Sequence, residues 1–343
     1  MVVAGAGRDV LEVLTLLGLA VVATAVVWKG SAWLEEATND LAAGYGVPSI
    51  VQGAVIAAVG SSMPELASVL LATLRHGEFE LGVGAIVGSA VFNLLVIPGI
   101  AVLVGGRMDT NRDLVYKESL FYMLAVAALL LTFSLAVIYY PVEGDVLQGT
   151  VTRPLALFPL ALYALYLFTQ YLDATGSGVE PADVSRLGAW SWFAFGLVLI
   201  VVGVEGLVLA AIGLGEAFST PAFLWGMIVV AAGSSVPDAF VSVAAARKGR
   251  ASVSLANVLG SNTFDLLVAI PAGVLVAGSL SVSFTHVVPM MAFLILATVV
   301  FFAIVRTDML LSKREAWTLL ALYGVFVCWL VLESVGATNV VPS

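Results

Sequence analysis

Two stretches of the chain repeat one pattern of acid, hydroxyl and proline residues within apolar surroundings. Residues 60–65 read Gly-Ser-Ser-Met-Pro-Glu, and residues 233–238 read Gly-Ser-Ser-Val-Pro-Asp. On a helix, Ser61 and Ser62 precede Glu65 by four and three residues, so all three share one face. The equivalent residues of the second stretch are Ser234, Ser235 and Asp238. Each stretch therefore groups a carboxylate with two hydroxyls.

A second pair of segments repeats at nearly the same distance. Residues 88–95 read Gly-Ser-Ala-Val-Phe-Asn-Leu-Leu, and residues 260–267 read Gly-Ser-Asn-Thr-Phe-Asp-Leu-Leu. They place Ser89 one helical turn before Asn93, and Ser261 one turn before Asp265. The repeats lie 172 to 173 residues apart in a chain of 343 residues. We therefore interpret the chain as a near-complete duplication.

Each repeat supplies oxygen atoms for a cation. Pro64 and Pro237 have no amide hydrogen for the carbonyl one turn earlier, so the helices should be kinked or broken there, with carbonyl groups free. Carboxylate, hydroxyl, amide and carbonyl oxygens suit hard cations such as Ca²⁺ and Na⁺, whereas zinc or copper would call for histidine or cysteine. A carboxylate in mid-membrane costs about 2.5–3.5 kcal/mol, so we expect the acids to face a cavity or a partner.

The composition identifies the elements that must position these residues. Apolar residues make up 61% of the chain and charged residues 11%, with a mean hydropathy of +1.08. The apolar runs are continuous and about 20 residues long, which favours membrane-spanning helices over a soluble domain or an alternating β-barrel. The formal charge of −9 argues against a nucleic acid partner. No cofactor and no required protein partner are indicated; the lipid bilayer is the expected surroundings.

Ten spans are predicted, which gives an all-α integral membrane protein. A polar linker, 173–187, separates a first five-helix repeat, 1–172, from a second, 188–343. An odd number of spans in each repeat predicts that equivalent helices cross in opposite directions, an inverted-topology arrangement. The predicted spans are 10–28, 47–74, 82–104, 119–140, 154–172, 190–212, 222–246, 253–277, 281–305 and 317–332.

Orientation follows from the basic residues of the loops. Three of the 14 lysines and arginines fall on the face that carries the termini, and eleven fall on the other. Because positive loops stay inside, both termini are predicted to be extracytoplasmic. We expect a multi-pass protein of the cell membrane.

Segments 60–98 and 233–271 resemble the α-repeats of the sodium/calcium exchanger family, within the calcium/cation antiporter superfamily. The amino-acid sequences of both segments are most similar to those of potassium-dependent exchangers and their prokaryotic relatives. The resemblance implies ten helices, ion sites where helices two, three, seven and eight meet, and exchange of three Na⁺ for each Ca²⁺. It implies no enzymatic activity and no catalytic residue.

The resemblance also implies roles for individual residues. Glu65 and Asp238 would be the principal Ca²⁺ ligands, with main-chain oxygens around Ser61 and Ser234. Asn93 and Asp265 would flank the central site. The Na⁺ sites would use Ser62, Ser235, Ser89, Ser261 and the carbonyl groups near Ala58 and Ala231.

The leading hypothesis is an alternating-access Na⁺/Ca²⁺ antiporter that performs electrogenic Ca²⁺ efflux. The alternative is an H⁺-coupled or K⁺-cotransporting Ca²⁺ exchanger. Asp265 resembles the potassium-dependent branch, although K⁺-independent relatives carry this acid too, so K⁺ coupling stays open. Proton-coupled relatives typically have a histidine after the acid, whereas Leu66 and Ala239 stand here. A passive cation channel and an intramembrane aspartyl protease using Asp238 and Asp265 are remote alternatives.

Overall fold

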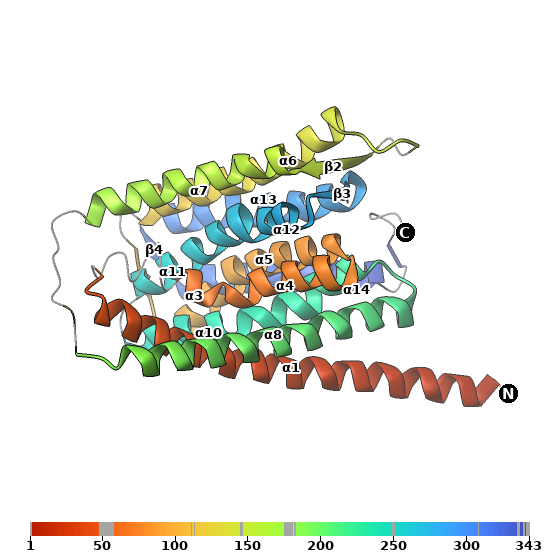
Figure 1. The fold of residues 1–343 in the computed structure, drawn as a ribbon, viewed down its shortest axis with the longest axis horizontal. Coiled ribbons are helices and arrows are strands. Elements are labelled where there is room, and N and C mark those ends of the chain that lie inside the picture. Colours follow the sequence, from red (N-terminus) through yellow and green to blue (C-terminus); the bar gives the residue numbers. More distant parts are fainter. Residues whose placement is uncertain are drawn as a thin grey trace.

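The structure is a computed structural model, and it is almost entirely helical (Figure 1). It describes residues 2–47, 58–110, 112, 114–144, 147–174, 181, 183–248, 251–307, 309–334, 337–338 and 340. The elements of the first half are α1 Val2–Gly44, α3 Ala58–Ser61, α4 Met63–His76, α5 Phe79–Gly105, β1 Met108–Asp109, the π-helix η2 Leu114–Glu118, α6 Ser119–Tyr139, β2 Gln148–Thr152 and α7 Arg153–Ala174. Those of the second half are α8 Arg186–Phe218, α9 Ala222–Trp225, the π-helix η3 Gly226–Val230, α10 Ala231–Arg247, α11 Ala251–Phe264, the π-helix η4 Asp265–Ala269, α12 Ile270–Ala277, β3 Ser279–Ser283, α13 Phe284–Arg306, β4 Leu310–Leu311 and α14 Lys313–Ser334.

Nine segments within the described residues are long and apolar enough to cross a membrane, which agrees with an all-α integral membrane protein. Residues 48–57 of the second predicted span, 47–74, lie outside the described residues. Its described part comprises α3 and α4. The count of ten spans and the placement of the termini therefore stay predictions.

The long helices α1 and α8 pack against each other in opposite directions. A side chain at Gly30 would lie 2.9 Å from the carbonyl oxygen of Gly196, and one at Gly203 would lie 3.0 Å from that of Ala23. Residue numbers thus rise along α1 as they fall along α8. A shift of 173 residues exchanges these two contacts, so α1 and α8 occupy equivalent positions and cross in opposite senses. In a membrane the hydrophobic effect contributes little to helix association, and small residues such as these glycines let the two backbones approach closely.

The centre of the bundle is formed by α5 and by the run from α11 to α12. Both segments are 83% buried over their most apolar windows, against 11% for α1. In Figure 1, α1 and α8 lie along one edge and α6 and α7 along the other, with α4, α5, α11 and α12 between them. Helix α5 carries the motif segment with Ser89 and Asn93, and the run from α11 into η4 carries the equivalent segment with Ser261 and Asp265. Both motif segments therefore lie in the buried core.

Two short antiparallel sheets connect the halves. Strand β1, which follows α5, pairs with β4 from the second half. Strand β3, which follows α12, pairs over five residues with β2 from the first half. Each sheet takes one strand from each half. Strands β1 and β3 follow the central helices of their halves, and β2 and β4 precede the last helix of each half, so the two sheets are equivalent under the duplication.

Candidate functional site

Three carboxylates lie inside the bundle. Glu65 on α4 is 1% exposed, Asp238 on α10 is 2% exposed, and Asp265, at the start of η4, is fully buried. An isolated buried carboxylate is strongly destabilising, so each needs polar partners or a counter-ion.

The acids of the two halves face serines of the opposite half. Glu65 faces Ser234, and Asp238 faces Ser61. These contacts are equivalent under the 173-residue offset. The carboxylate of each repeat is therefore supported by the motif of the other, and the site exists only where both repeats meet.

The remaining motif serines also meet across the interface. The Ser89 hydroxyl lies 2.7 Å from that of Ser235 and donates to Glu65 Oε1 at 3.3 Å. The Ser62 hydroxyl donates to the main-chain oxygen of Ser261 at 3.4 Å. Ser62 and Ser235 are equivalent residues, as are Ser89 and Ser261, so this pair of contacts also follows the duplication.

Amide groups connect the two halves beside the acids. Asn93 Nδ2 donates to Asn262 Oδ1 at 3.0 Å, and Asn262 Nδ2 donates to the carbonyl oxygen of Ala90 at 3.2 Å. Ala90 is the residue equivalent to Asn262, so the amide present in only one repeat bonds the backbone of its counterpart. Asn262 was not among the predicted site residues. The sequence feature that points to Asn262 is that the first repeat has alanine, Ala90, at the equivalent position.

The prolines act differently in the two halves. Helix α3 ends at Ser61, and α4 begins at Met63 with Pro64 in its first turn, so the helix is interrupted at Ser62, three residues before Glu65. In the second half, α10 continues through Pro237, and the irregular segment is η3, which precedes Ala231. The expected break is therefore present in the first half, while in the second the helical path is continuous. Proline is tolerated in the first turn, where its missing N–H is not needed, but within α10 the Gly233 carbonyl loses its usual donor.

The two main-chain positions implied as Na⁺ ligands lie in helical segments. Ala58 is the first described residue of α3, and Ala231 lies where the π-helix η3 passes into α10. The Ala231 carbonyl accepts a hydrogen bond from the Ser234 hydroxyl at 3.3 Å. That carbonyl oxygen therefore already accepts one hydrogen bond from a motif serine.

Several acceptor oxygens of the site have no hydrogen-bond donor among the described residues. They are Glu65 Oε2, Asp238 Oδ1, Asn93 Oδ1 and both carboxylate oxygens of Asp265. Buried acceptors without donors are sites where a cation is favourable. No three acidic, histidine or cysteine side chains of the described chain form a group that could hold one metal ion.

A fourth acid, Glu35 on α1, lies near enough to Asp238 for the two negative charges to repel each other. The predicted first span ended at Trp28, whereas α1 continues to Gly44. Polar residues after Trp28 end the apolar run without ending the helix, so hydropathy placed Glu35 outside the membrane segment.

Other charged groups lie apart from the central acids. Glu205 accepts from Arg75 Nε and lies 3.1 Å from His76 Nε2 at the far end of α4. Eleven residues of helix separate Glu65 from His76, or about 16 Å. His286 lies 2.6 Å from Glu80 at the start of α5.

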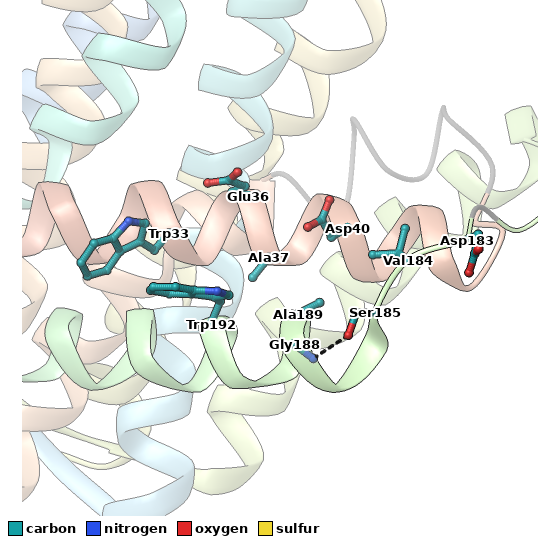
Figure 2. Close-up of a pocket in the computed structure, with 10 residues that line it drawn as sticks. All are labelled: Trp33, Glu36, Ala37, Asp40, Asp183, Val184, Ser185, Gly188, Ala189 and Trp192. Atoms are coloured by element: carbon teal, nitrogen blue, oxygen red, sulfur yellow. Dashed lines mark hydrogen bonds between the residues drawn. The ribbon is translucent and has the colours of Figure 1, made fainter.

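A surface hollow of about 590 Å³ lies between α1 and the segment that begins α8 (Figure 2). Trp33 and Trp192 form its walls, and Glu36, Asp40 and Asp183 are its acids. It contains none of the motif residues, so its acids form a solvated face separate from the central site.

Comparison with known proteins identifies the family. The sequence profile described as "Sodium/calcium exchanger protein" matches residues 15–172 and 188–332. The sodium/calcium exchanger MaX1 of Methanosarcina acetivorans is 26% identical over 270 residues, covering 69% of this chain and 76% of that protein.

Two solved structures share the fold. The sodium-calcium exchanger NCX_Mj matches with a TM-score of 0.63 at 20% identity, covering 92% of this chain and 98% of that one. The H⁺/Ca²⁺ exchanger CAX matches with a TM-score of 0.69 at 15% identity, covering 93% and 85%. Since the profile covers both halves of the chain, including all four motif segments, the chain belongs to the sodium/calcium exchanger protein family.

Proposed function

We propose that this protein is a secondary active antiporter that exchanges Na⁺ for Ca²⁺ by alternating access, with electrogenic Ca²⁺ efflux from the cell. The supporting observation is the reciprocal contact of Glu65 with Ser234 and of Asp238 with Ser61. A site built equally from two inverted repeats can be exposed to either side when the repeats rearrange.

Charge neutrality explains why exchange is obligatory. An empty pair of buried carboxylates is too costly to move through a low-dielectric barrier, so the site must carry Ca²⁺ or monovalent ions in each direction. Glu65 and Asp238 supply two charges, which match one divalent cation. We assign the main-chain oxygens around Ser61 and Ser234 to Ca²⁺ as well, and place Asn93 and Asp265 beside the central site. The Na⁺ sites are assigned to Ser62, Ser235, Ser89, Ser261 and the carbonyl groups near Ala58 and Ala231. The two repeats are assigned to residues 1–172 and 188–343, joined by the linker 173–187.

The test is radiolabelled Ca²⁺ flux into proteoliposomes, with Na⁺, K⁺ and H⁺ gradients imposed one at a time. We expect Na⁺-gradient-driven Ca²⁺ uptake that responds to a K⁺/valinomycin potential, because three Na⁺ for one Ca²⁺ moves one charge, worth about 2.3 kcal/mol per 100 mV. Flux without any counter-ion would indicate a channel instead.

A second candidate is H⁺/Ca²⁺ exchange, which is favoured by the higher structural similarity to CAX. Against it stand Leu66 and Ala239, which follow the two acids. In choline medium, Ca²⁺ movement driven by a pH gradient alone would select this candidate over Na⁺ exchange.

A further inference from the structure

The chain has two histidines, and each contacts a glutamate of the opposite half. His76 ends α4 in the first half, and its Nε2 lies 3.1 Å from Oε1 of Glu205 on α8. His286 is in the first turn of α13 in the second half, and its Nδ1 lies 2.6 Å from Oε2 of Glu80 on α5. All four side chains are mostly buried, with exposed fractions between 16% and 25%. Neither pair belongs to the central ion site.

Both pairs hold the same short turn, which joins α4 to α5. His76 and Glu80 are four residues apart, on either side of Gly77, whose left-handed backbone (φ 72°) ends α4. In Figure 1, α4 and α5 lie between α8 and α13, so the turn is bridged to the second half on two sides. Because α4 carries Glu65 and α5 carries Ser89, the bridges act on both helices that bring the first repeat to the site.

Few other charged groups meet these two pairs among the described residues. Arg75 Nε also lies 3.1 Å from Glu205 Oε1, but its side chain is 67% exposed, so solvent screens this contact. The ring of Phe223, on α9, stacks on that of His286 with 4.6 Å between the centroids. A surface hollow of about 510 Å³ adjoins His286, and its acids are Glu78, Glu80 and Glu216.

The chemistry of the imidazole makes the strength of both bridges depend on pH. Histidine ordinarily changes its charge between about pH 5 and pH 8, whereas glutamate ordinarily titrates below this range. A protonated imidazole adds the attraction of opposite charges to its hydrogen bond with a carboxylate, and a neutral imidazole keeps at most the hydrogen bond. Each bridge is therefore strongest in acid and weakens as the pH rises through the range of histidine.

The duplication does not supply the same bridges at the turn between α10 and α11. In the other repeat, the residues that correspond to His76, Glu80 and Glu205 are Gly249, Ser252 and Ala32. None of these three residue types titrates near neutral pH, and the chain has no third histidine. A site that alternates must open to each face in turn, so bridges at one turn alone bias the protein toward the state that is closed at that face.

We propose that the two His–Glu pairs form a proton-dependent clamp on the α4–α5 turn, which favours the state in which the ion site is closed to the face of the bundle that carries this turn. This inference rests on the proposed exchange function and concerns its regulation. Acidification strengthens the clamp and slows exchange, and a pH above the range of histidine releases the turn. The sequence predicts that this face is extracytoplasmic.

The test is the double variant His76→Gln/His286→Gln in proteoliposomes. Na⁺-driven Ca²⁺ flux is measured from about pH 5.5 to about pH 8.5, with the same pH on both sides, which brackets the range of histidine. Glutamine can still donate a hydrogen bond but does not take up a proton. We expect the variant to exchange about three- to tenfold faster than the unmodified protein at the acid end, and within about twofold of it at the alkaline end. Because both proteins have the same central acids, the titration of those acids cancels in the ratio of the two rates.

The matched control is Arg153→Gln, which removes another contact between the halves. Arg153 Nε donates to the carbonyl oxygen of Leu275, on α12, at 2.8 Å. Arginine keeps its proton throughout this range, so the ratio of variant to unmodified rate should be the same at every pH. If the histidine variant does not insert into membranes, Glu80→Gln/Glu205→Gln removes the charge of the other partner in each bridge and should give the same pH-dependent ratio.

Thermal unfolding in detergent provides a readout that does not require transport. The clamp contributes stability that is present below the range of histidine and lost above it, so the double histidine variant should lose more of its thermal midpoint at about pH 6 than at about pH 8. A rate ratio that is constant across the pH range would overturn the proposal, and so would a constant difference in midpoint. Absence of Na⁺-driven Ca²⁺ flux in the unmodified protein at every pH would instead refute the exchange function, so the two failures are distinguishable.

Discussion

The two repeats place the same arrangement of acids and serines at the candidate ion site. Glu65 and Asp238 each face a serine of the opposite repeat, and the contact of Ser89 with Ser235 corresponds to that of Ser62 with Ser261. This correspondence shows that the site is assembled by the duplication rather than by one half. It suits a transporter whose two end states exchange the roles of the repeats.

The repeats differ beside these acids. Asn93 in the first corresponds to Asp265 in the second, and Ala90 corresponds to Asn262. Helix α5 is regular through Asn93, whereas the π-helical segment η4 begins at Asp265. Such segments frequently mark functional sites, because they displace backbone groups from the regular ladder. We propose that the symmetric residues hold the divalent ion and that the asymmetric residues bind further charge.

The largest effect should come from neutralising the symmetric acids. Glu65→Gln and Asp238→Asn each remove one of two charges that match Ca²⁺, so we expect exchange to fall on the order of a hundredfold or more, equivalent to about 3 kcal/mol. Ca²⁺ flux in proteoliposomes measures the loss, and gel filtration in detergent tests that the variants remain folded. The conservative control is Asp238→Glu, which keeps the charge and should retain exchange. Unchanged Ca²⁺ affinity in both neutral variants would remove these acids from the site.

A selective effect is expected where the repeats differ. Asp265→Asn makes the second repeat resemble the first, so it should alter Na⁺ or K⁺ dependence more than Ca²⁺ binding. We expect a shift of about tenfold or more in half-saturating Na⁺ and about threefold or less for Ca²⁺, because a charged ligand contributes more than a neutral one. Flux titrated with each cation provides the comparison. Complete loss of Ca²⁺ binding would place Asp265 among the divalent ligands.

Sequence patterns predicted the class of fold and the elements that carry the motifs. The long apolar runs predicted the membrane segments, and the repeated spacing predicted that Glu65 and Asp238 belong to one ion site. The position of α1 as a helix continuing to Gly44 was not predicted, because hydropathy detects the apolar surroundings and not the helix itself. Glu35 was missed for this reason.

Contacts across the repeats could not be predicted from spacing within one helix. The bond from Asn262 to Ala90 depends on how closely α5 and α11 approach. Helix α10 continues through Pro237 without a break, and the irregular backbone is η3, which ends at Val230, seven residues before the proline. Local proline chemistry predicts a defect in the hydrogen bonding, but the neighbouring turns determine whether the helix ends.

Helix crossing at the centre should tolerate less change than the surface of α1. A side chain at Gly88 of α5 would lie 2.5 Å from the Met227 carbonyl oxygen, whereas Gly18 has nothing within 4 Å. Gly88→Ala forces α5 away from η3, so we expect a stability loss of about 1–3 kcal/mol and a lower thermal midpoint in detergent. Gly18→Ala, a matched substitution on an open helix face, should leave the midpoint unchanged or raise it slightly. Equal midpoints for the two variants would show that the helices adjust without strain.

The smallest effect should distinguish two equivalent serines. Ser89→Ala removes contacts with Glu65 and Ser235, whereas the Ser261 hydroxyl donates to the Val258 carbonyl of its own helix at 3.2 Å. The contact of Ser62 with Ser261 uses the main-chain oxygen, so it survives Ser261→Ala. We expect Ser89→Ala to raise the half-saturating cation concentration about fivefold, because it removes hydrogen bonds to other helices. Ser261→Ala should raise it about twofold or less, because it removes only a hydrogen bond within its own helix. Flux titrations of both variants test this difference. Equal shifts would mean that both hydroxyls coordinate ions directly, and the symmetry of the scaffold would then extend to the monovalent ligands as well.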